Sequence, residues 1–335
     1  MTIADIAREA GVSKVAVSYA LNGKPGVSDA TRERILDIAA QAGFRANTSA
    51  RALAGAAPRV VGMALQRPAH TLGVEPFFME LVSGVEAVLS VRNFALLLQM
   101  VSEDQAELDL YRQWWRDRRV DGVLICDIRT DDARIPFVEE LGLPAVIIDP
   151  PNAGGSIPSI WSDDAASVVE AVEYLVALGH RHIARVAGIA DLAHTHIRND
   201  AFQRARNAIG LPGPTCVWTD YSGGAGAGAT RELLSGRQPP TAIIYDNDIM
   251  AVAGLATAQE IGWSVPGDIS ILAWDDSPIC RLVHPPMTAL TRDIGGYGSQ
   301  AANLVLAMIA NEPVANVSVE PAHLTPRGST GQRYG

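Results

Sequence analysis

The stretch MTIADIAREAGVSKVAVSYALN, residues 1–22, decides the fold at the start of this chain. Thr2 can cap a first helix, with Asp5 at the position of a capping box. Gly11 supplies the left-handed conformation of a tight helix exit, and Ser13 can cap a second helix. This spacing predicts a helix-turn-helix, the motif that lays its second helix in the DNA major groove.

Apolar side chains recur at helical spacing through this region and define three inward faces. Ser28 can cap a third helix that runs to about Gly43. A plain helical hairpin docked on a larger domain is the alternative, but three cap and turn signals at the right spacing favour the helix-turn-helix. The inward positions are Ile3, Ile6, Ala7 and Ala10, then Val12, Val17, Ala20 and Leu21, then Ile35, Leu36, Ile38 and Ala39.

The charge of the chain is unevenly distributed. The 335 residues are 48% hydrophobic and 19% charged, which indicates a globular protein of more than one domain. The net charge of −10 argues against a broadly basic surface. Residues 1–58 hold seven Lys/Arg and five Asp/Glu, whereas the remainder holds 20 and 32. The mildly basic part is therefore the part assigned to DNA.

We expect a cytoplasmic protein without a metal, a cofactor or a membrane segment. Charged side chains interrupt the N-terminus, so no signal peptide is predicted, and no apolar run approaches the roughly 18 residues of a membrane span. Cys126, Cys216 and Cys280 are widely separated and fit no zinc spacing, so they are expected to be reduced.

From residue 59 onward, buried-strand runs alternate with amphipathic stretches, which predicts parallel sheets. Two such series predict two doubly wound α/β lobes, with a ligand site at the carboxyl ends of the strands, in the cleft between the lobes. The first series has strands at 59–65, 94–100, 121–127 and 144–149 and helices at 76–91, 104–118 and 133–141. The second has strands at 182–188, 215–218, 242–245 and 269–275 and helices from about 196, from about 224 and at 247–262.

The segment TIADIAREAGVSKVAVSYALNGKPGVSDATRERILDIAAQAGFRAN, residues 2–47, resembles the headpiece of the LacI/GalR family of transcription regulators. The match continues through ARALAG and, in the family's order, LPAVIID, LVALGHRHIARVAG, NDIMAVAG, ISILAWDDSPIC and PPMTAL. The resemblance covers essentially the whole chain. It implies a periplasmic-binding-protein-like body in which the chain crosses between the lobes three times, with a last helix at about 293–311 in the first lobe.

Three regions follow from the pattern and the resemblance. Residues 1–46 form the helix-turn-helix headpiece, 47–58 the hinge helix and linker, and 59–335 the effector-binding and dimerisation domain. The lobe boundaries are expected at about 59–157 and 290–316 for the first lobe and about 158–289 and 317–335 for the second.

The hinge contains a short segment that Asn47 can cap, ending at Gly55 and Pro58. Such a helix is too short to be stable alone, so a flexible linker is the alternative. The resemblance implies a helix that folds when two copies meet in the DNA minor groove. Leu53 then stands where the family inserts a wedge between base steps, which kinks the duplex.

The resemblance implies base readout by Lys14, Val15 and the position of Tyr19. The family commonly has arginine at the last position, and arginine takes guanine bidentately whereas tyrosine cannot. The operator half-site is therefore expected to differ, unless Tyr19 packs against the third helix instead. The remaining expected DNA contacts, mostly to phosphates, are Thr2, Ser13, Ala16, Ser18, Asn22 and Arg32.

Polar side chains follow several predicted strands, and aromatic residues accompany them. Carboxylates, amides and guanidinium groups suit polyol recognition, and aromatic faces complement a sugar ring. Helix caps or turns are the alternative roles for Asp149 and Asp248, and a core position is the alternative for Trp161. Ala201 stands where the family motif usually has glycine. The expected effector contacts are Phe77, Phe78, Asp149, Trp161, Arg198, Tyr221, Asn247, Asp275 and Arg292, seven of them by family position and the two phenylalanines as further aromatic candidates.

The leading interpretation is a repressor that binds a pseudo-palindromic operator as a homodimer and responds to a small-molecule effector, a sugar or sugar derivative. One alternative is an enzyme that holds Mg²⁺ through Asp246, Asp248, Asp275 and Asp276, although no Walker loop or G-x-S-x-G elbow accompanies them. Another is a cytoplasmic sugar-binding protein. His194 and His196 are assigned no metal.

Overall fold

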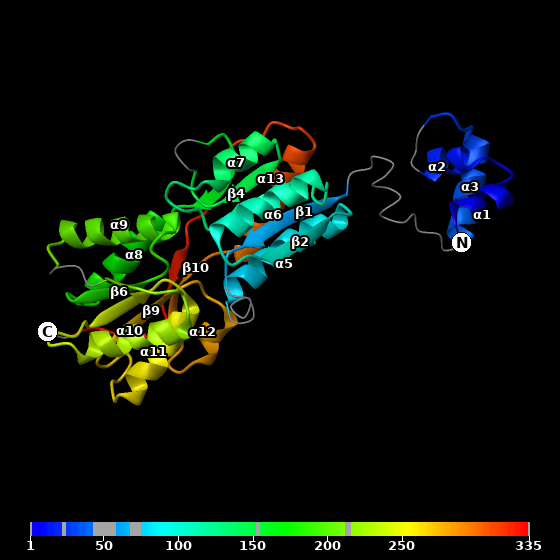
Figure 1. Ribbon diagram of the computed structural model, residues 1–335. Helices are drawn as coiled ribbons and strands as arrows, with labels where there is room; N and C mark the ends of the chain where they lie inside the picture. Colours follow the sequence, from blue (N-terminus) through cyan, green and yellow to red (C-terminus); the bar gives the residue numbers. More distant parts are fainter. Residues whose placement is uncertain are drawn as a thin grey trace. The chain divides into compact units, whose positions relative to one another are not determined.

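The computed structural model describes residues 2–21, 25–42, 58–67, 75–151, 155–211 and 216–333. The chain divides into two compact units, residues 1–58 and residues 59–335 (Figure 1). Asn22 and the predicted hinge with Leu53 lie outside the described residues.

The headpiece contains three helices, α1 (Ile3–Ala10), α2 (Lys14–Leu21) and α3 (Asp29–Gln41). The predicted capping box is confirmed: the backbone N–H of Thr2 donates to Asp5 at 2.9 Å, and the Asp5 N–H donates to the Thr2 hydroxyl at 3.4 Å. Gly11 adopts a left-handed φ of 65°. Ser13 caps α2 by accepting the N–H of Ala16 at 3.1 Å.

Two details of the third helix differ from the prediction. Ser28 precedes α3, but its hydroxyl bonds to Thr31 Oγ1 at 2.9 Å and caps no backbone N–H. Leu36 is 42% exposed and does not join the core. Ile35 and Ala39 lie one helical turn apart and are buried, and Leu36 is rotated by one residue away from that line.

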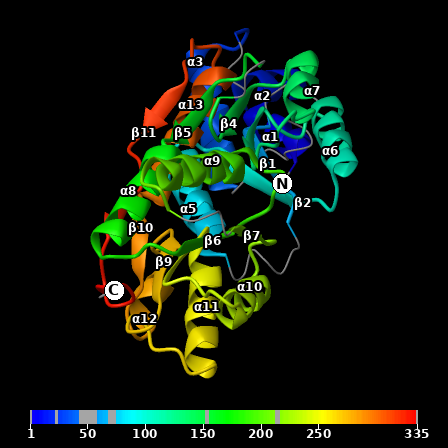
Figure 2. The same cartoon turned by 90° about the vertical axis from the view of Figure 1, so that its left-hand side faces the viewer.

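Residues 59–335 form two lobes, each built on a six-stranded sheet (Figures 1 and 2). The first lobe has strand order β11-β5-β4-β3-β1-β2 and the second β12-β10-β9-β8-β6-β7. Only β12 runs antiparallel to its neighbour among the paired strands described. The first sheet contains β1 (Val60–Leu65), β2 (Ala95–Met100), β3 (Gly122–Cys126), β4 (Ala145–Ile148), β5 (Ser159–Ser162) and β11 (Val317–Val319). The second contains β6 (Ile183–Ala187), β7 (Cys216–Trp218), β8 (Ala242–Tyr245), β9 (Ser270–Trp274), β10 (Thr288–Thr291) and β12 (His323–Thr325).

Helices cover both faces of each sheet. In the first lobe, α5 (Pro76–Val91) and α13 (Ile294–Ile309) bury apolar side chains on one face, and α6 (Asp104–Arg116) and α7 (Arg134–Leu141) on the other. In the second lobe the two faces are covered by a first pair, α8 (Asp164–Ala177) and α9 (Ala193–Ala208), and by α10 (Gly223–Ser235), α11 (Asp248–Glu260) and the short α12 (Pro278–Leu282). Burial on both sides explains why the strands are continuous apolar runs.

The chain crosses between the lobes three times, after β5, after β10 and after β11. The expected lobe boundaries need a correction of a few residues. β5 and β11 pair within the first sheet, at Ile148↔Ile160 and Val317↔Ile160, so the first lobe extends past 157 and past 316. β10 pairs with β9 at Thr288↔Leu272, so the second lobe extends past 289.

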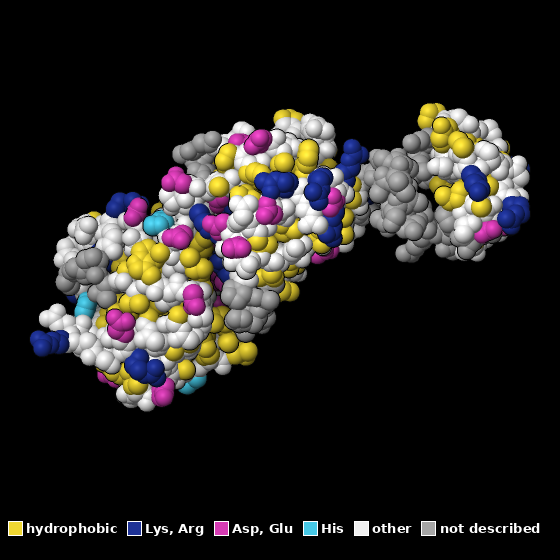
Figure 3. All heavy atoms as spheres, viewed as in Figure 1, with side chains coloured by type: hydrophobic (Ala, Val, Ile, Leu, Met, Phe, Trp, Pro, Cys, Tyr) yellow, Lys and Arg dark blue, Asp and Glu magenta, His cyan; other side chains and the backbone are white. Residues whose placement is uncertain are grey.

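The surface of the body is mixed in charge. On the face shown in Figure 3, acidic and basic side chains are scattered among apolar ones, without a broad basic area. No described helix combines the length and apolar character that a membrane crossing needs. The three cysteines are unpaired.

Candidate effector cavity

A cavity with about 70 Å³ of free space is lined by residues of both lobes. Part of its wall consists of residues that follow strands, since Asp127 comes after β3, Asp149 after β4, Asp275 after β9 and Arg292 after β10. This is the place where doubly wound sheets bind ligands. Eight of the nine residues expected from the sequence line it: Phe77, Phe78, Asp149, Arg198, Tyr221, Asn247, Asp275 and Arg292.

Trp161 is the exception. It lies on β5, where side chains alternate between the two faces of the sheet. Ser162 lines the cavity and Ile160 joins the apolar core, whereas Trp161 is half-buried and is not among the cavity-lining residues. The sequence pattern did not predict β5, so its alternation could not be assigned.

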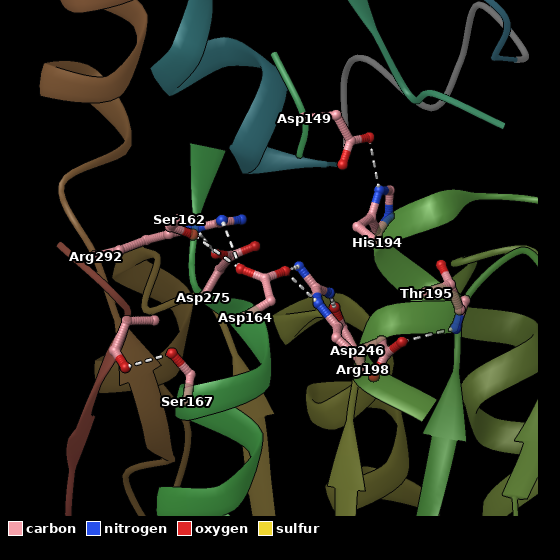
Figure 4. A network of polar contacts seen from close by, with 12 residues as sticks. Asp149, Ser162, Asp164, Ser167, His194, Thr195, Arg198, Asp246, Asp275 and Arg292 are labelled. Atoms are coloured by element: carbon pink, nitrogen blue, oxygen red, sulfur yellow. Dashed lines mark hydrogen bonds and ion pairs between the residues drawn. The ribbon is translucent and has the colours of Figure 1, made fainter. Parts of the chain in front are cut away.

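Asp164, the first residue of α8, pairs with two arginines (Figure 4). Its Oδ2 accepts from Nε of Arg198 at 2.7 Å, and its Oδ1 lies 3.9 Å from Nη1 of Arg292. Arg292 in turn donates to Asp275 at 2.9 Å. Burial alone would raise the pKa of Asp164, but the two guanidinium groups hold it below its ordinary value. The result is a buried row of alternating charges, Arg198–Asp164–Arg292–Asp275. Asp164 comes after β5 and Arg292 follows β10, the strands after which the chain crosses between the lobes.

Arg198 is held from a second side by an aromatic ring. Its guanidinium carbon lies 3.7 Å from the centroid of the Trp274 ring, and Trp274 is fully buried on β9. Cation–π contact and the ion pair to Asp164 together fix the guanidinium plane. Arg198 therefore presents a fixed donor to the cavity.

Arg67, Glu75 and Asp127 form the first-lobe wall. Nη2 of Arg67 lies 2.9 Å from Oδ2 of Asp127, and its Nε lies 4.0 Å from Oε2 of Glu75. The Arg67 guanidinium carbon lies 5.7 Å from the ring centroids of both Phe78 and Tyr221. Burial raises the pKa of Glu75 to about 7, with Arg67 opposing the shift.

His194 connects the two lobes (Figure 4). Its Nδ1 lies 3.3 Å from Oδ2 of Asp149 in the first lobe. Its Nε2 lies 2.9 Å from the hydroxyl of Tyr221 in the second lobe. The Tyr221 hydroxyl also lies 3.0 Å from Oγ1 of Thr195. Burial raises the pKa of Asp149, and the hydrogen bond from His194 opposes that rise.

Three lining residues have left-handed backbones: Asp127 at φ 54°, Tyr221 at φ 69° and Asp275 at φ 65°. Each such residue other than glycine costs on the order of 1 kcal/mol, and strain of this kind gathers at ligand sites. Tyr221 also needs a glycine beside it, because a Cβ at Gly188 would lie 1.8 Å from Cζ of the tyrosine ring.

Three of the four carboxylates considered for Mg²⁺ pair with separate arginines. Asp246 pairs with Arg185, accepting from its Nε at 2.8 Å, and Asp276 accepts from Arg327. Asp275 pairs with Arg292. Burial raises the pKa of Asp248 to about 6. No group of metal-ligating side chains occurs within the described part of the chain.

Asn247 has a structural role in addition to lining the cavity. Its Oδ1 accepts the N–H of Met250 at 2.8 Å and so caps α11. Its Nδ2 donates to the backbone carbonyl of Tyr221 at 3.0 Å. Asn247 therefore fixes the backbone of Tyr221 at the cavity wall.

Several lining residues were missed by sequence reasoning. Asp127 ends the third predicted strand and Arg67 lies two residues after the first, so the strand-end rule that found Asp149 could have found them. His194 was considered only as a metal ligand. Glu75, Asp164 and Tyr297 belong to helices or their caps and carried no strand-end signal. Six acidic or basic residues of the described wall were thus not expected at the effector: Arg67, Glu75, Asp127, Asp164, His194 and Asp246, the last two having been considered only for a metal.

The headpiece exposes one side of α2. Lys14 is exposed, Val15 is 59% exposed and Tyr19 is 38% exposed, while Ala16 and Ser18 are half-buried. Tyr19 also packs on the loop before α3, since a Cβ at Gly26 would lie 3.2 Å from Cδ2 of its ring.

The remaining described headpiece residues expected at DNA have mixed exposure. Thr2 and Ser13 are exposed and serve as the helix caps described above, and Arg32 is half-buried on α3. The headpiece face in Figure 3 carries apolar and basic side chains together.

A three-helix headpiece with an exposed second helix, joined to a two-lobe body around a polar cavity, defines a ligand-responsive DNA-binding regulator. Residues 2–47 match the family model described as bacterial regulatory proteins, lacI family, and residues 172–330 match that of the periplasmic binding protein-like domain. The chain belongs to the LacI family, and it is a DNA-binding transcriptional regulator.

The chain matches known transcriptional regulators over nearly the whole length of both proteins. The HTH-type transcriptional regulator CelR of Thermobifida fusca is 30% identical, covering 98% of both chains. Catabolite control protein A of Priestia megaterium is 28% identical, covering 96% of this chain and 97% of that protein. The structure of the lac repressor dimer bound to operator and the anti-inducer ONPF is similar at a TM-score of 0.86, with 25% identity and 99% coverage of both chains. A CelR–cellobiose complex has a TM-score of 0.75 and 27% identity, covering 98% and 99%.

Proposed function

We propose that this chain is a repressor whose affinity for its operator is set by a carbohydrate effector bound in the cavity. The carrying observation is the buried Arg198–Asp164–Arg292–Asp275 row, which offers fixed donors and acceptors beside aromatic rings. Adjacent hydroxyls of a sugar can bond to such groups in pairs, and its apolar face can stack on the rings. The relative CelR is known in complex with cellobiose, which supports this class of ligand.

The effector acts by changing the balance between lobe arrangements. A ligand held by both lobes binds the closed arrangement more tightly and so favours it. By thermodynamic linkage, the factor by which the effector changes operator affinity equals the factor by which the operator changes effector affinity. The Asp149–His194 contact across the cleft is one of the contacts that a change of arrangement breaks or forms.

The same proposal includes a homodimer in the cytoplasm that reads two half-sites of operator DNA. One headpiece makes few contacts, and dimers place two recognition helices one helical turn apart on the duplex. Lys14, Val15 and Tyr19 are the proposed base-reading residues. We further propose that the chain is not an enzyme, because three of the four carboxylates considered for catalysis, those at positions 246, 275 and 276, are already paired with arginines.

The test uses the full chain. A thermal-shift screen of neutral sugars identifies a ligand, and operator binding is then measured with and without it. Arg198→Ala should abolish the response to the sugar while DNA binding persists. Arg204→Ala, an exposed change on the same helix, is the matched control. A normal sugar response in Arg198→Ala would remove the cavity from the proposal.

A further inference from the structure

The cavity wall contains more negative than positive charge. The described lining residues include three arginines and six carboxylates. Each arginine already contacts a carboxylate at hydrogen-bond distance: Arg67 with Asp127, Arg198 with Asp164 and Arg292 with Asp275. Among the described lining residues, every arginine is therefore already paired, and none is available as the counter-ion of an incoming anion.

The remaining carboxylates increase this excess. Asp246 is neutralised by Arg185 behind the wall. Asp149 accepts the backbone N–H of Ile128 and lies beside His194, and among the described residues it has no arginine or lysine partner. Glu75 lies 4.0 Å from Arg67. A phosphate ester would bring further negative charge into this buried space. Burying a charge without a counter-ion costs several kcal/mol, so such a ligand is disfavoured.

A specific gap lies between Arg67 and Glu75. Nε of Arg67 and Oε2 of Glu75 face each other at 4.0 Å, and neither atom has a hydrogen-bond partner among the described residues. Both side chains are at least nine-tenths buried. Leaving two buried polar groups unsatisfied is costly, which indicates that a further atom completes the pair.

One chemical group fits this gap directly. A hydroxyl accepts from the Arg67 N–H and donates to the Glu75 carboxylate, whereas a phosphate or carboxylate oxygen can only accept. The Arg67 side chain is held in place by Asp127 and by the rings of Phe78 and Tyr221, so it does not need to reorganise for the ligand.

We propose that Arg67 and Glu75 form a hydroxyl-binding subsite, and that this cavity selects an uncharged polyhydroxylated ligand over its phosphate ester. This inference rests on the proposed function, since it concerns the effector of the same cavity. Glu75 is the specificity-determining residue: above about pH 7, where it is ionised, its carboxylate accepts the ligand hydroxyl and repels an anion in the same place, so the affinities are compared at about pH 8.

The first experiment compares matched pairs on the full-length protein: glucose with glucose 6-phosphate, ribose with ribose 5-phosphate, and cellobiose as a further neutral probe. Calorimetry gives the affinities. The neutral member of a binding pair should bind at least about tenfold more tightly than its ester. An ester that binds as well as its neutral partner overturns the inference while leaving the proposed function standing. If no member of the panel binds, the proposed function fails and the inference falls with it.

The second experiment uses the neutral sugar that binds. Glu75→Ala should weaken it about tenfold or more, because a hydrogen bond to a charged group is lost. Glu75→Gln keeps a hydrogen-bond acceptor and should retain most of the affinity for the neutral sugar. Because the negative charge is removed, the difference in affinity between the neutral sugar and its phosphate ester should become smaller. Glu140→Ala, an exposed change in the same lobe, should leave both affinities unchanged. Equal affinities in wild type, Glu75→Ala and Glu75→Gln would overturn the subsite. A circular-dichroism spectrum like that of wild type and a cooperative thermal transition for each variant exclude misfolding as the cause of a lost affinity.

Discussion

Nδ1 of His194, in the second lobe, lies 3.3 Å from Oδ2 of Asp149, in the first. The pair joins two sheets whose strands otherwise belong to separate cores. Because Asp149 follows β4 and His194 lies in the first turn of α9, the contact reports directly on the distance between the lobes. The same imidazole touches the Tyr221 hydroxyl, so the link extends into the cavity wall.

Replacing His194 should loosen the closed arrangement. His194→Phe keeps the ring but removes both hydrogen bonds, each of which contributes about 1 kcal/mol. We expect effector affinity to fall by about fivefold to tenfold, because less of the protein is in the binding-competent state. Small-angle scattering should show a larger radius of gyration for the ligand-free variant.

The control is His196→Phe, two residues along α9, where the side chain is exposed. It should match wild type in scattering and affinity. If His194→Phe also matches wild type in both measurements, the interlobe contact has no role in closure.

Arg198 should also be important for stability. Arg198→Ala leaves Asp164 buried without its nearest cation, and breaking a buried pair typically costs about 3–5 kcal/mol. The double variant Arg198→Ala/Asp164→Ala should recover part of that loss, since no uncompensated charge remains. Chemical denaturation of wild type, Arg198→Ala, Asp164→Ala and the double variant measures the coupling. A single variant as stable as wild type would show that the ion pair contributes nothing.

The fold and much of the cavity could be predicted from the sequence because strand ends carry their polar residues locally. Asp149, Asp275 and Arg292 follow strands, and parallel sheets bring such ends to one edge. The prediction that Trp161 lines the cavity was wrong because β5 was not predicted. Without that strand, the sequence could not show that Trp161 and Ser162 point to opposite faces of the sheet. The Arg67–Glu75 gap depends on a distance between β1 and α5, which no local pattern specifies.

The pH dependence of stability should reveal the raised pKa of Glu75. Burial, opposed by Arg67, raises its folded-state pKa to about 7, above the ordinary value of 4.5. The folded protein therefore holds this proton more tightly than the unfolded chain, and stability falls as pH rises from about 4.5 to about 7. The free energy of unfolding lost over this pH range is about 3 kcal/mol.

Glu75→Gln removes the titrating group. Its free energy of unfolding should exceed that of wild type above about pH 7 and approach it at about pH 4. Asp127, Asp248 and Asp275 add to the local negative charge and remain in both proteins. Glu140→Gln serves as the exposed control. Parallel pH profiles for wild type and Glu75→Gln would contradict a raised pKa.

Tyr19 should determine part of the operator sequence. Its ring is partly exposed and packs beside Gly26, so its hydroxyl and its packing can be separated by substitution. Tyr19→Phe keeps the ring and should leave headpiece stability unchanged while altering affinity for the operator. Tyr19→Arg should create a preference for guanine at one position of each half-site, since a bidentate contact discriminates by about 1–3 kcal/mol. Selection of binding sites from random DNA compares the three proteins. Identical preferred sequences would mean that Tyr19 acts only by packing, and recognition would then rest on Lys14, Val15 and their neighbours.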